Sequence, residues 1–271
     1  MSCLEWANPG AATLLFAHAN GFNAQTYRTL LAPLAARFRI VACDLRGHGF
    51  STLPAQPGLV GKWTIFRDDL GALADMVSDE PVILAGHSLG ATAGLMAAAE
   101  SSGHIRSLLL LEPVLLTPPL DGRRTQSNNL AEMAARRRSV FPSFEAALDY
   151  YRKRGIFARW PEEARADYLA GGLLQNANGT MRLACAPEWE SEIFSHPPFG
   201  IAAIAGQIKC PLTILRGTLG STAVDEQVGL LRSVKPDTHV VTLEGANHFL
   251  PLEEGERTRD EMLRAIRPGD K

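Results

Sequence analysis

The chain has 271 residues, of which 46% are hydrophobic and 21% charged, and its formal net charge is −2. These values are typical of one globular domain, with or without an insertion, and they give no sign of a polyanionic partner. The four cysteines are widely spaced without a C-x-x-C pair, and no apolar run reaches roughly 20 residues, which argues against a zinc ribbon, a disulfide framework and a membrane span.

Along residues 1–112, short apolar runs alternate with amphipathic helical patterns. Buried strands are predicted at 13–18, 39–44, 81–85 and 105–111, and helices at 25–36, 65–77 and 91–100. The last strand carries four successive leucines, as expected where both faces of a strand are buried. This alternation predicts an α/β protein with a mostly parallel sheet and helices on both faces.

The alternation stops after residue 112 and returns near residue 208. The intervening segment reads as helical and irregular, with aromatic residues that look exposed, among them Tyr151, Trp160 and Trp189. Strands are then predicted at 211–216 and 239–243, and helices near 225–234 and 252–266. We therefore expect a core formed by residues 1–112 and 208–271, with residues 113–207 inserted as a helical cap.

A G-x-S-x-G pattern, Gly86-His87-Ser88-Leu89-Gly90, connects a predicted strand to a predicted helix. Such a turn is so tight that small residues are needed on both sides of the central serine. The turn exposes the hydroxyl and directs the first N–H groups of the helix toward negative charge on a substrate. Ser88 is therefore the predicted nucleophile.

A serine hydroxyl needs a base to remove its proton, and seven histidines are available. His248 lies directly after the last predicted strand and before the last helix, which places it at the strand ends where the serine turn also emerges. His248 is therefore the predicted general base. For His87, the neighbour of the serine, we expect a role in packing or in orienting the turn.

Three segments, 44–51, 86–90 and 245–249, together resemble the α/β-hydrolase superfamily. This resemblance implies a mostly parallel sheet, a helical cap over the site, and a Ser-His-acid triad. It also implies that Asp44, Arg46 and His48 serve the structure, so no catalytic role is assigned to them.

The same resemblance implies an oxyanion hole made of two backbone N–H groups. One belongs to Leu89, the residue after the nucleophile. The other comes from the loop after the first core strand, where the alignment places Asn20 as the donor and leaves Gly21 and Phe22 as alternatives.

The triad acid departs from the family pattern. The family usually carries it in the turn after the strand that follows the cap, but residues 216–222 contain no carboxylate. Glu112 directly follows the four leucines, and an unpaired buried charge is costly unless a partner such as His248 compensates it. We predict Glu112 as the acid, with Asp225 as the alternative and a site without a functional acid as the third possibility.

The predicted activity is hydrolysis of an ester, thioester or related carbonyl compound through an acyl-Ser88 intermediate, without metal or organic cofactor. The alternative is a lyase or a ligand-binding receptor of the same fold. We expect a small, partly apolar substrate, no nucleic-acid partner, no membrane span and a cytoplasmic location; the oligomeric state is left open.

Two groups of arginines, Arg123 with Arg124 and residues 136–138, offer positive charge to an acidic substrate or lie on solvated helix faces. For residues 136–138 the solvated face is preferred.

Overall fold

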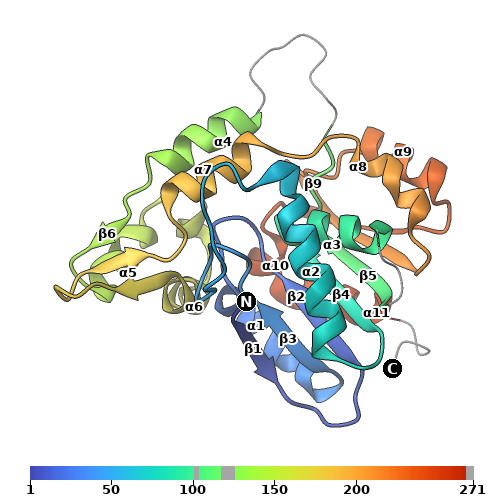
Figure 1. Ribbon diagram of the computed structural model, residues 1–271, viewed down its shortest axis with the longest axis horizontal. Coiled ribbons are helices and arrows are strands. Elements are labelled where there is room, and N and C mark those ends of the chain that lie inside the picture. The colour runs from blue at the N-terminus through green and yellow to red at the C-terminus, as the bar shows by residue number, and fades with distance from the viewer. Residues whose placement is uncertain (101–103, 117–125, 267–271) are drawn as a thin grey trace.

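The structure, a computed structural model, describes residues 1–100, 104–116 and 126–266. Seven strands form the main sheet in the order β1-β3-β2-β4-β5-β9-β10 (Figure 1). Their bounds are β1 Cys3–Trp6, β2 Thr13–Ala17, β3 Arg39–Cys43, β4 Val82–His87, β5 Ile105–Leu111, β9 Leu212–Leu219 and β10 His239–Asn247. Every neighbouring pair is parallel except β1 with β3. The predicted mostly parallel sheet is confirmed, and the antiparallel edge strand β1 was not foreseen.

Both faces of the sheet are buried, and successive residues of a strand alternate between two cores. In β2, Leu15 and Ala17 belong to one core, whereas Leu14 and Phe16 belong to the other. This explains why the central strands are continuous apolar runs. One core includes residues of α2 (Thr64–Val77), α3 (Leu89–Glu100) and α9 (Asp225–Val234), and the other includes residues of α1 (Arg28–Leu31) and α11 (Gly255–Ala265).

Two predicted helices are interrupted. The segment 25–36 forms η1 (Ala24–Tyr27), α1 and η2 (Ala32–Ala36), and Pro33 lies at the start of η2. Proline has no N–H to donate and clashes with the preceding turn, so a continuous α-helix does not cross Pro33. The last predicted helix is divided into α10 (Leu250–Glu253) and α11 at Glu254, whose backbone is not helical. A short 3₁₀ turn, η3 (Gly61–Trp63), precedes α2.

The segment between β5 and β9 contains helices and a small second sheet, and much of it lies to the left of the main sheet in Figure 1. Its helices are α4 Gln126–Ala135, α5 Phe144–Arg152, η4 Gly155–Arg159, α6 Glu162–Gly172, α7 Pro187–Ser195, α8 Ile201–Ile204 and η5 Ala205–Gln207. The antiparallel sheet has the order β6 (Val140–Phe141), β8 (Met181–Leu183), β7 (Leu173–Gln175). Sequence reasoning missed these short strands, and the cap boundaries at residues 113 and 207 stay a prediction.

Aromatic residues of this segment are buried, contrary to the expectation of exposure. Tyr151, Trp160 and Trp189 are 4%, 2% and 2% exposed. The Trp160 ring lies 5.3 Å from that of Phe22, in the loop after β2. The prediction was wrong here because the segment packs its own aromatic core onto that loop. Within the three described ranges, no helix is long and apolar enough to cross a membrane.

Candidate active site

Ser88 occupies the tight turn between β4 and α3. Its backbone is left-handed, with a φ of 53°, which costs energy for a residue other than glycine and recurs at functional turns. A Cβ on Gly86 would lie 2.6 Å from the carbonyl carbon of Gly90, and a Cβ on Gly90 would collide with the carbonyl of Ala17 in β2. The two glycines of the motif are therefore required by the close approach of backbone segments.

Backbone hydrogen bonds connect this turn to the end of β5. The Ser88 N–H donates to the carbonyl of Leu111 at 3.0 Å, and the next residue, Glu112, donates its own N–H to the carbonyl of Leu215 in β9 at 2.8 Å. Glu112 also has a left-handed backbone, with a φ of 48°. Two neighbouring strands thus end in strained residues, one carrying a hydroxyl and the other a carboxylate.

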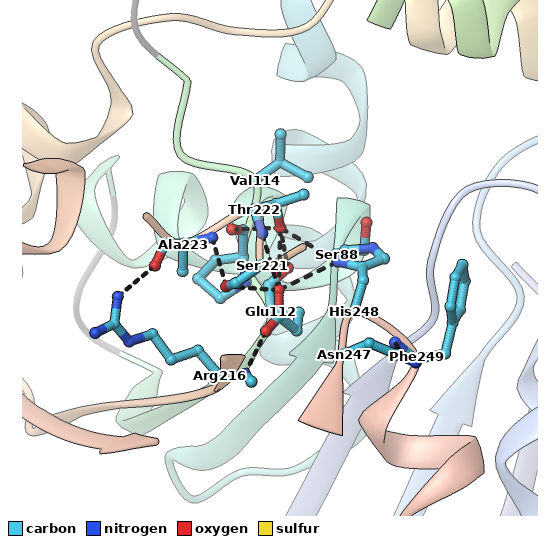
Figure 2. A network of polar contacts seen from close by, with 12 residues as sticks. Ser88, Glu112, Val114, Arg216, Ser221, Thr222, Ala223, Asn247, His248 and Phe249 are labelled. Atoms are coloured by element: carbon cyan, nitrogen blue, oxygen red, sulfur yellow. Dashed lines mark hydrogen bonds and ion pairs between the residues drawn. The ribbon is translucent and has the colours of Figure 1, made fainter. Parts of the chain in front are cut away.

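The Glu112 side chain is buried, and donors from β9 and from the turn after it hold its carboxylate (Figure 2). Oε1 accepts from the Gly217 N–H at 2.6 Å, and Oε2 accepts from the Thr222 N–H and the Ser221 hydroxyl at 3.0 Å each. Burial by itself raises the pKa of Glu112, but hydrogen bonding and charge interaction with His248, together with the N–H donors, leave that pKa below its ordinary value. The group is therefore a carboxylate at neutral pH.

His248 directly follows β10, and its ring approaches this carboxylate. Nδ1 lies 3.3 Å from Glu112 Oε2 and 3.3 Å from the Thr222 hydroxyl. Because a carboxylate oxygen accepts, Nδ1 carries the proton in the neutral ring, which leaves Nε2 free to accept one. Figure 2 labels Ser88 together with Glu112 and His248, and Ser88 is tied into the structure there by its backbone, whose carbonyl accepts from the Thr92 hydroxyl at 3.1 Å.

Asp225, the alternative acid, lies elsewhere. It is the first residue of α9, its side chain is 90% exposed, and it forms an ion pair with Arg216. Of the two candidates, Glu112 is the one whose carboxylate contacts His248 among the described residues.

His87 joins the loop of His248 to the loop after β2. Its Nε2 donates to the His248 carbonyl at 2.8 Å, and its Nδ1 accepts from the Tyr27 hydroxyl at 2.6 Å. Burial, reinforced by the nearby His248, lowers the pKa of His87 to about 3, so the ring is neutral. The Tyr27 hydroxyl accepts in turn from the Ala19 N–H at 3.2 Å. Sequence reasoning missed the contact of Tyr27 with His87, since nothing local signals it.

The loop after β2 is attached to the start of α3. The Gly90 N–H donates to the carbonyl of His18 at 3.1 Å. His18 is itself held by the Leu45 N–H, which donates to its Nε2 at 2.9 Å. Burial lowers the pKa of His18 to about 4, so this ring is also neutral. The candidate oxyanion loop therefore begins directly beside the serine turn.

Within that loop, the backbone N–H groups differ in their availability. The Gly21 N–H donates to His48 Nε2 at 3.0 Å, and the Phe22 N–H donates to a carbonyl of the same loop at 3.1 Å. The N–H groups of Asn20 and Leu89 have no hydrogen-bond partner among the residues that the structure describes. Of the three loop positions considered from the sequence, Asn20 thus has the free donor.

The segment 44–51 braces the structure around the site. The Asp44 carboxylate accepts from the N–H groups of Ala24 and Phe50, both at 2.9 Å, and Arg46 pairs with Asp69 at 2.7 Å. These contacts connect the segment to η1 and to α2. Within residues 1–100, 104–116 and 126–266, no three His, Cys, Asp or Glu side chains gather as a metal site.

The basic tract at residues 136–138 does not form a solvated helix face. It follows α4, and Arg137 is largely buried in an ion pair with Glu190 of α7. The expectation was wrong for Arg137 because its partner lies 53 residues further along the chain. Arg138 lies over the Phe141 ring at 4.9 Å. Arg123 and Arg124 lie outside the described residues.

A mostly parallel sheet with helices on both faces, and a serine at a strand-turn-helix junction, define an α/β hydrolase. The family model described as the alpha/beta hydrolase family matches residues 14–261, and the chain belongs to this family. It is thereby assigned to the hydrolases as a class of enzyme.

Similar proteins include hydrolases of different names. A 2-(acetamidomethylene)succinate hydrolase from Mesorhizobium japonicum is 25% identical over 239 residues, which are 88% of this chain and 81% of that protein. Lipase LipV from Mycobacterium tuberculosis is 33% identical over 134 residues, and the match spans 49% of this chain but only 40% of the lipase. The crystal structure of E-2-(acetamidomethylene)succinate hydrolase has a TM-score of 0.79 at 22% identity, covering 97% of this chain and 94% of that chain.

Proposed function

We propose that the protein is a serine hydrolase that cleaves an ester, thioester or amide-type carbonyl substrate through an acyl-Ser88 intermediate. His248 is the general base and Glu112 the acid that orients it. The observation that carries the proposal is the contact of 3.3 Å between Glu112 Oε2 and His248 Nδ1, at the strand ends where the strained Ser88 turn also lies.

In the acylation step, His248 Nε2 accepts the hydroxyl proton of Ser88 as the oxygen attacks the substrate carbonyl. The charged Glu112 stabilises the imidazolium ion that forms. The N–H groups of Leu89 and Asn20 donate to the oxyanion of the tetrahedral intermediate, and such donors are worth about 2.7–4 kcal/mol each in related sites. His248 then returns the proton to the leaving group.

In the deacylation step, His248 removes a proton from water, which attacks the acyl carbonyl. The oxyanion is again held by the two N–H groups, and collapse of the second tetrahedral intermediate releases the acid product and regenerates the Ser88 hydroxyl. Each step balances with the groups named, and no further reactant is needed.

Aromatic rings around the histidines support a substrate with an apolar part. The Phe249 ring lies 5.3 Å from that of His248, and the Phe22 ring lies 6.4 Å from that of His87. The Trp160 ring packs against that of Phe22, and its indole N–H is buried without a partner among the described residues. The names of the relatives, an acetamido-bearing succinate hydrolase and a lipase, are consistent with hydrolysis at a carbonyl carbon.

A fluorophosphonate probe tests the nucleophile. The wild-type protein should be labelled at Ser88, Ser88→Ala should not be labelled, and Ser195→Ala on α7 serves as the matched control that labels normally. If the folded wild type is not labelled, the mechanism is wrong as stated.

Product analysis separates hydrolysis from the alternatives. Reaction in H₂¹⁸O should place one ¹⁸O atom in the carboxylate product of a p-nitrophenyl ester. A lyase acting on its own substrate would form product without this incorporation, and a binding protein would form none.

A further inference from the structure

A largely buried ion pair, Arg137 with Glu190, lies outside the proposed triad. Arg137 Nη1 contacts Glu190 Oε2, and the side chains are only 18% and 9% exposed. Arg137 Nη2 also donates to the hydroxyl groups of Tyr151, at 2.9 Å, and Tyr168. Withdrawing two charges from water is costly, and apolar residues of similar size would often stabilise a fold equally well. A role in fixing geometry would account for this cluster better than a role in stability.

The ion pair rests directly against the candidate oxyanion loop. A Cβ on Gly21 would lie 2.5 Å from Glu190 Oε1 and 3.2 Å from Arg137 Nη1. The Asn20 side-chain amide donates to the backbone carbonyl of Glu190 at 3.1 Å. Because Gly21 has a φ of 76° and no side chain, its backbone can lie between the ion pair and the rest of the loop.

The helix that carries Glu190 is fixed to the core by its preceding residue. The indole N–H of Trp189 donates to the carbonyl of Arg46 at 3.0 Å. The same carbonyl lies 3.0 Å from His48 Nδ1, whose other nitrogen accepts from the Gly21 N–H. Accepting at Nε2 requires the proton on Nδ1, and the contact with the Arg46 carbonyl favours that tautomer, while Nε2 also lies 3.3 Å from the Asn20 side-chain oxygen.

We propose that the Arg137–Glu190 pair holds the loop at Asn20 and Gly21 in position, so that the Asn20 N–H faces the oxyanion. The inference rests on the proposed function. On this proposal, α7 supports the oxyanion hole in a fixed position and does not move freely over it.

The test removes both charges while keeping the side-chain size, in the double variant Arg137→Met/Glu190→Gln. With p-nitrophenyl acetate, kcat should fall at least tenfold while KM changes less than twofold. The inhibition constant of phenylboronic acid, which forms a tetrahedral anionic adduct on a serine, should rise by a similar factor. Arg137→Lys, which keeps a cation beside Glu190, should recover most of kcat.

The matched control is Arg152→Met/Glu162→Gln, which removes an ion pair whose side chains are 44% and 50% exposed. Its kinetics should equal those of the wild type. Wild-type kcat and phenylboronic acid binding in a folded Arg137→Met/Glu190→Gln protein would overturn the proposal, as would a change confined to KM.

Amide hydrogen exchange reports the position of the loop independently of catalysis. The N–H groups of Gly21 and Phe22, both hydrogen-bonded, should exchange faster in the double variant than in the wild type and in the control. If the wild type is not labelled by fluorophosphonate but exchange still rises, the proposed function fails and the positioning role stands. Unchanged exchange overturns the positioning role even if the enzyme is active.

Discussion

Replacing Glu112 by glutamine removes the negative charge of a buried side chain whose two carboxylate oxygens both accept hydrogen bonds. The carboxylate accepts at both oxygens, from the Gly217 N–H on one side and from Thr222, Ser221 and His248 on the other. An amide can keep an acceptor toward only one side. With its oxygen toward Gly217, its NH₂ group faces the Nδ1–H of the histidine, donor against donor.

The histidine then favours the tautomer with the proton on Nε2, which cannot accept the proton of Ser88. Loss of the correct tautomer and of the negative charge lowers turnover by about 10⁴-fold in triads of this kind, or about 5.5 kcal/mol at 1.36 kcal/mol per decade. The N–H of Thr222, which makes a part-buried hydrogen bond, also loses its acceptor, and this costs up to about 1–3 kcal/mol of folding free energy. Glu112→Gln should therefore fold with reduced stability and lose nearly all activity.

The assay is steady-state hydrolysis of p-nitrophenyl acetate, with urea unfolding followed by circular dichroism to establish the folded state. Asp225→Asn is the matched control, because this exposed carboxylate pairs with Arg216 and should leave kcat within twofold. A folded Glu112→Gln protein with more than a tenth of wild-type kcat would refute the reasoning. So would a large loss in Asp225→Asn.

Two further predictions concern stability. Gly217→Ala should lower the unfolding free energy by about 1–3 kcal/mol in urea titrations, because its Cβ would collide with the backbone of β10, whereas Gly229→Ala, with open space at its Cβ, should not be destabilised. The pKa values of His18 and His87 are lowered to about 4 and about 3, mainly by burial, and that of His48 also falls well below its ordinary value. The unfolded chain therefore binds more protons below pH 6.5, and stability should fall as the pH drops from 6.5 toward 4, by up to about 1.4 kcal/mol per pH unit for each histidine. A constant unfolding free energy between pH 7 and pH 5 would contradict this.

The sequence predicts the main sheet well because its strands are buried on both faces and therefore read as unbroken apolar runs. The strand predicted at 105–111 coincides with β5. The strands of the second sheet have only two or three residues each, including Arg182 and Gln175, and give no periodic signal. The last core strand also proved longer than predicted, since β10 continues past Leu243 through a register shift to Asn247.

For the site, the sequence was informative about residues that directly follow a predicted strand. Residues that end parallel strands meet at one edge of the sheet, so the sequence alone predicts that Ser88, Glu112 and His248 lie near each other. The Arg137 contact could not be foreseen in this way, because the ion pair depends on how the segment after α4 packs against α7. The sequence around Arg137 resembles that of a solvated arginine.

The donors around Glu112 also bear on how such sites change during evolution. The Gly217 N–H belongs to β9 and the Thr222 N–H to the turn after it, yet both serve a carboxylate that comes from the end of β5. A second carboxylate in that turn would face Glu112 across the same donors, and two such groups this close share one proton instead of both ionising. A lineage that moves its acid from one strand end to the other therefore passes through a form with a competing pair of acids or with none. The hydroxyl groups of Ser221 and Thr222 keep the turn polar without adding that competing charge.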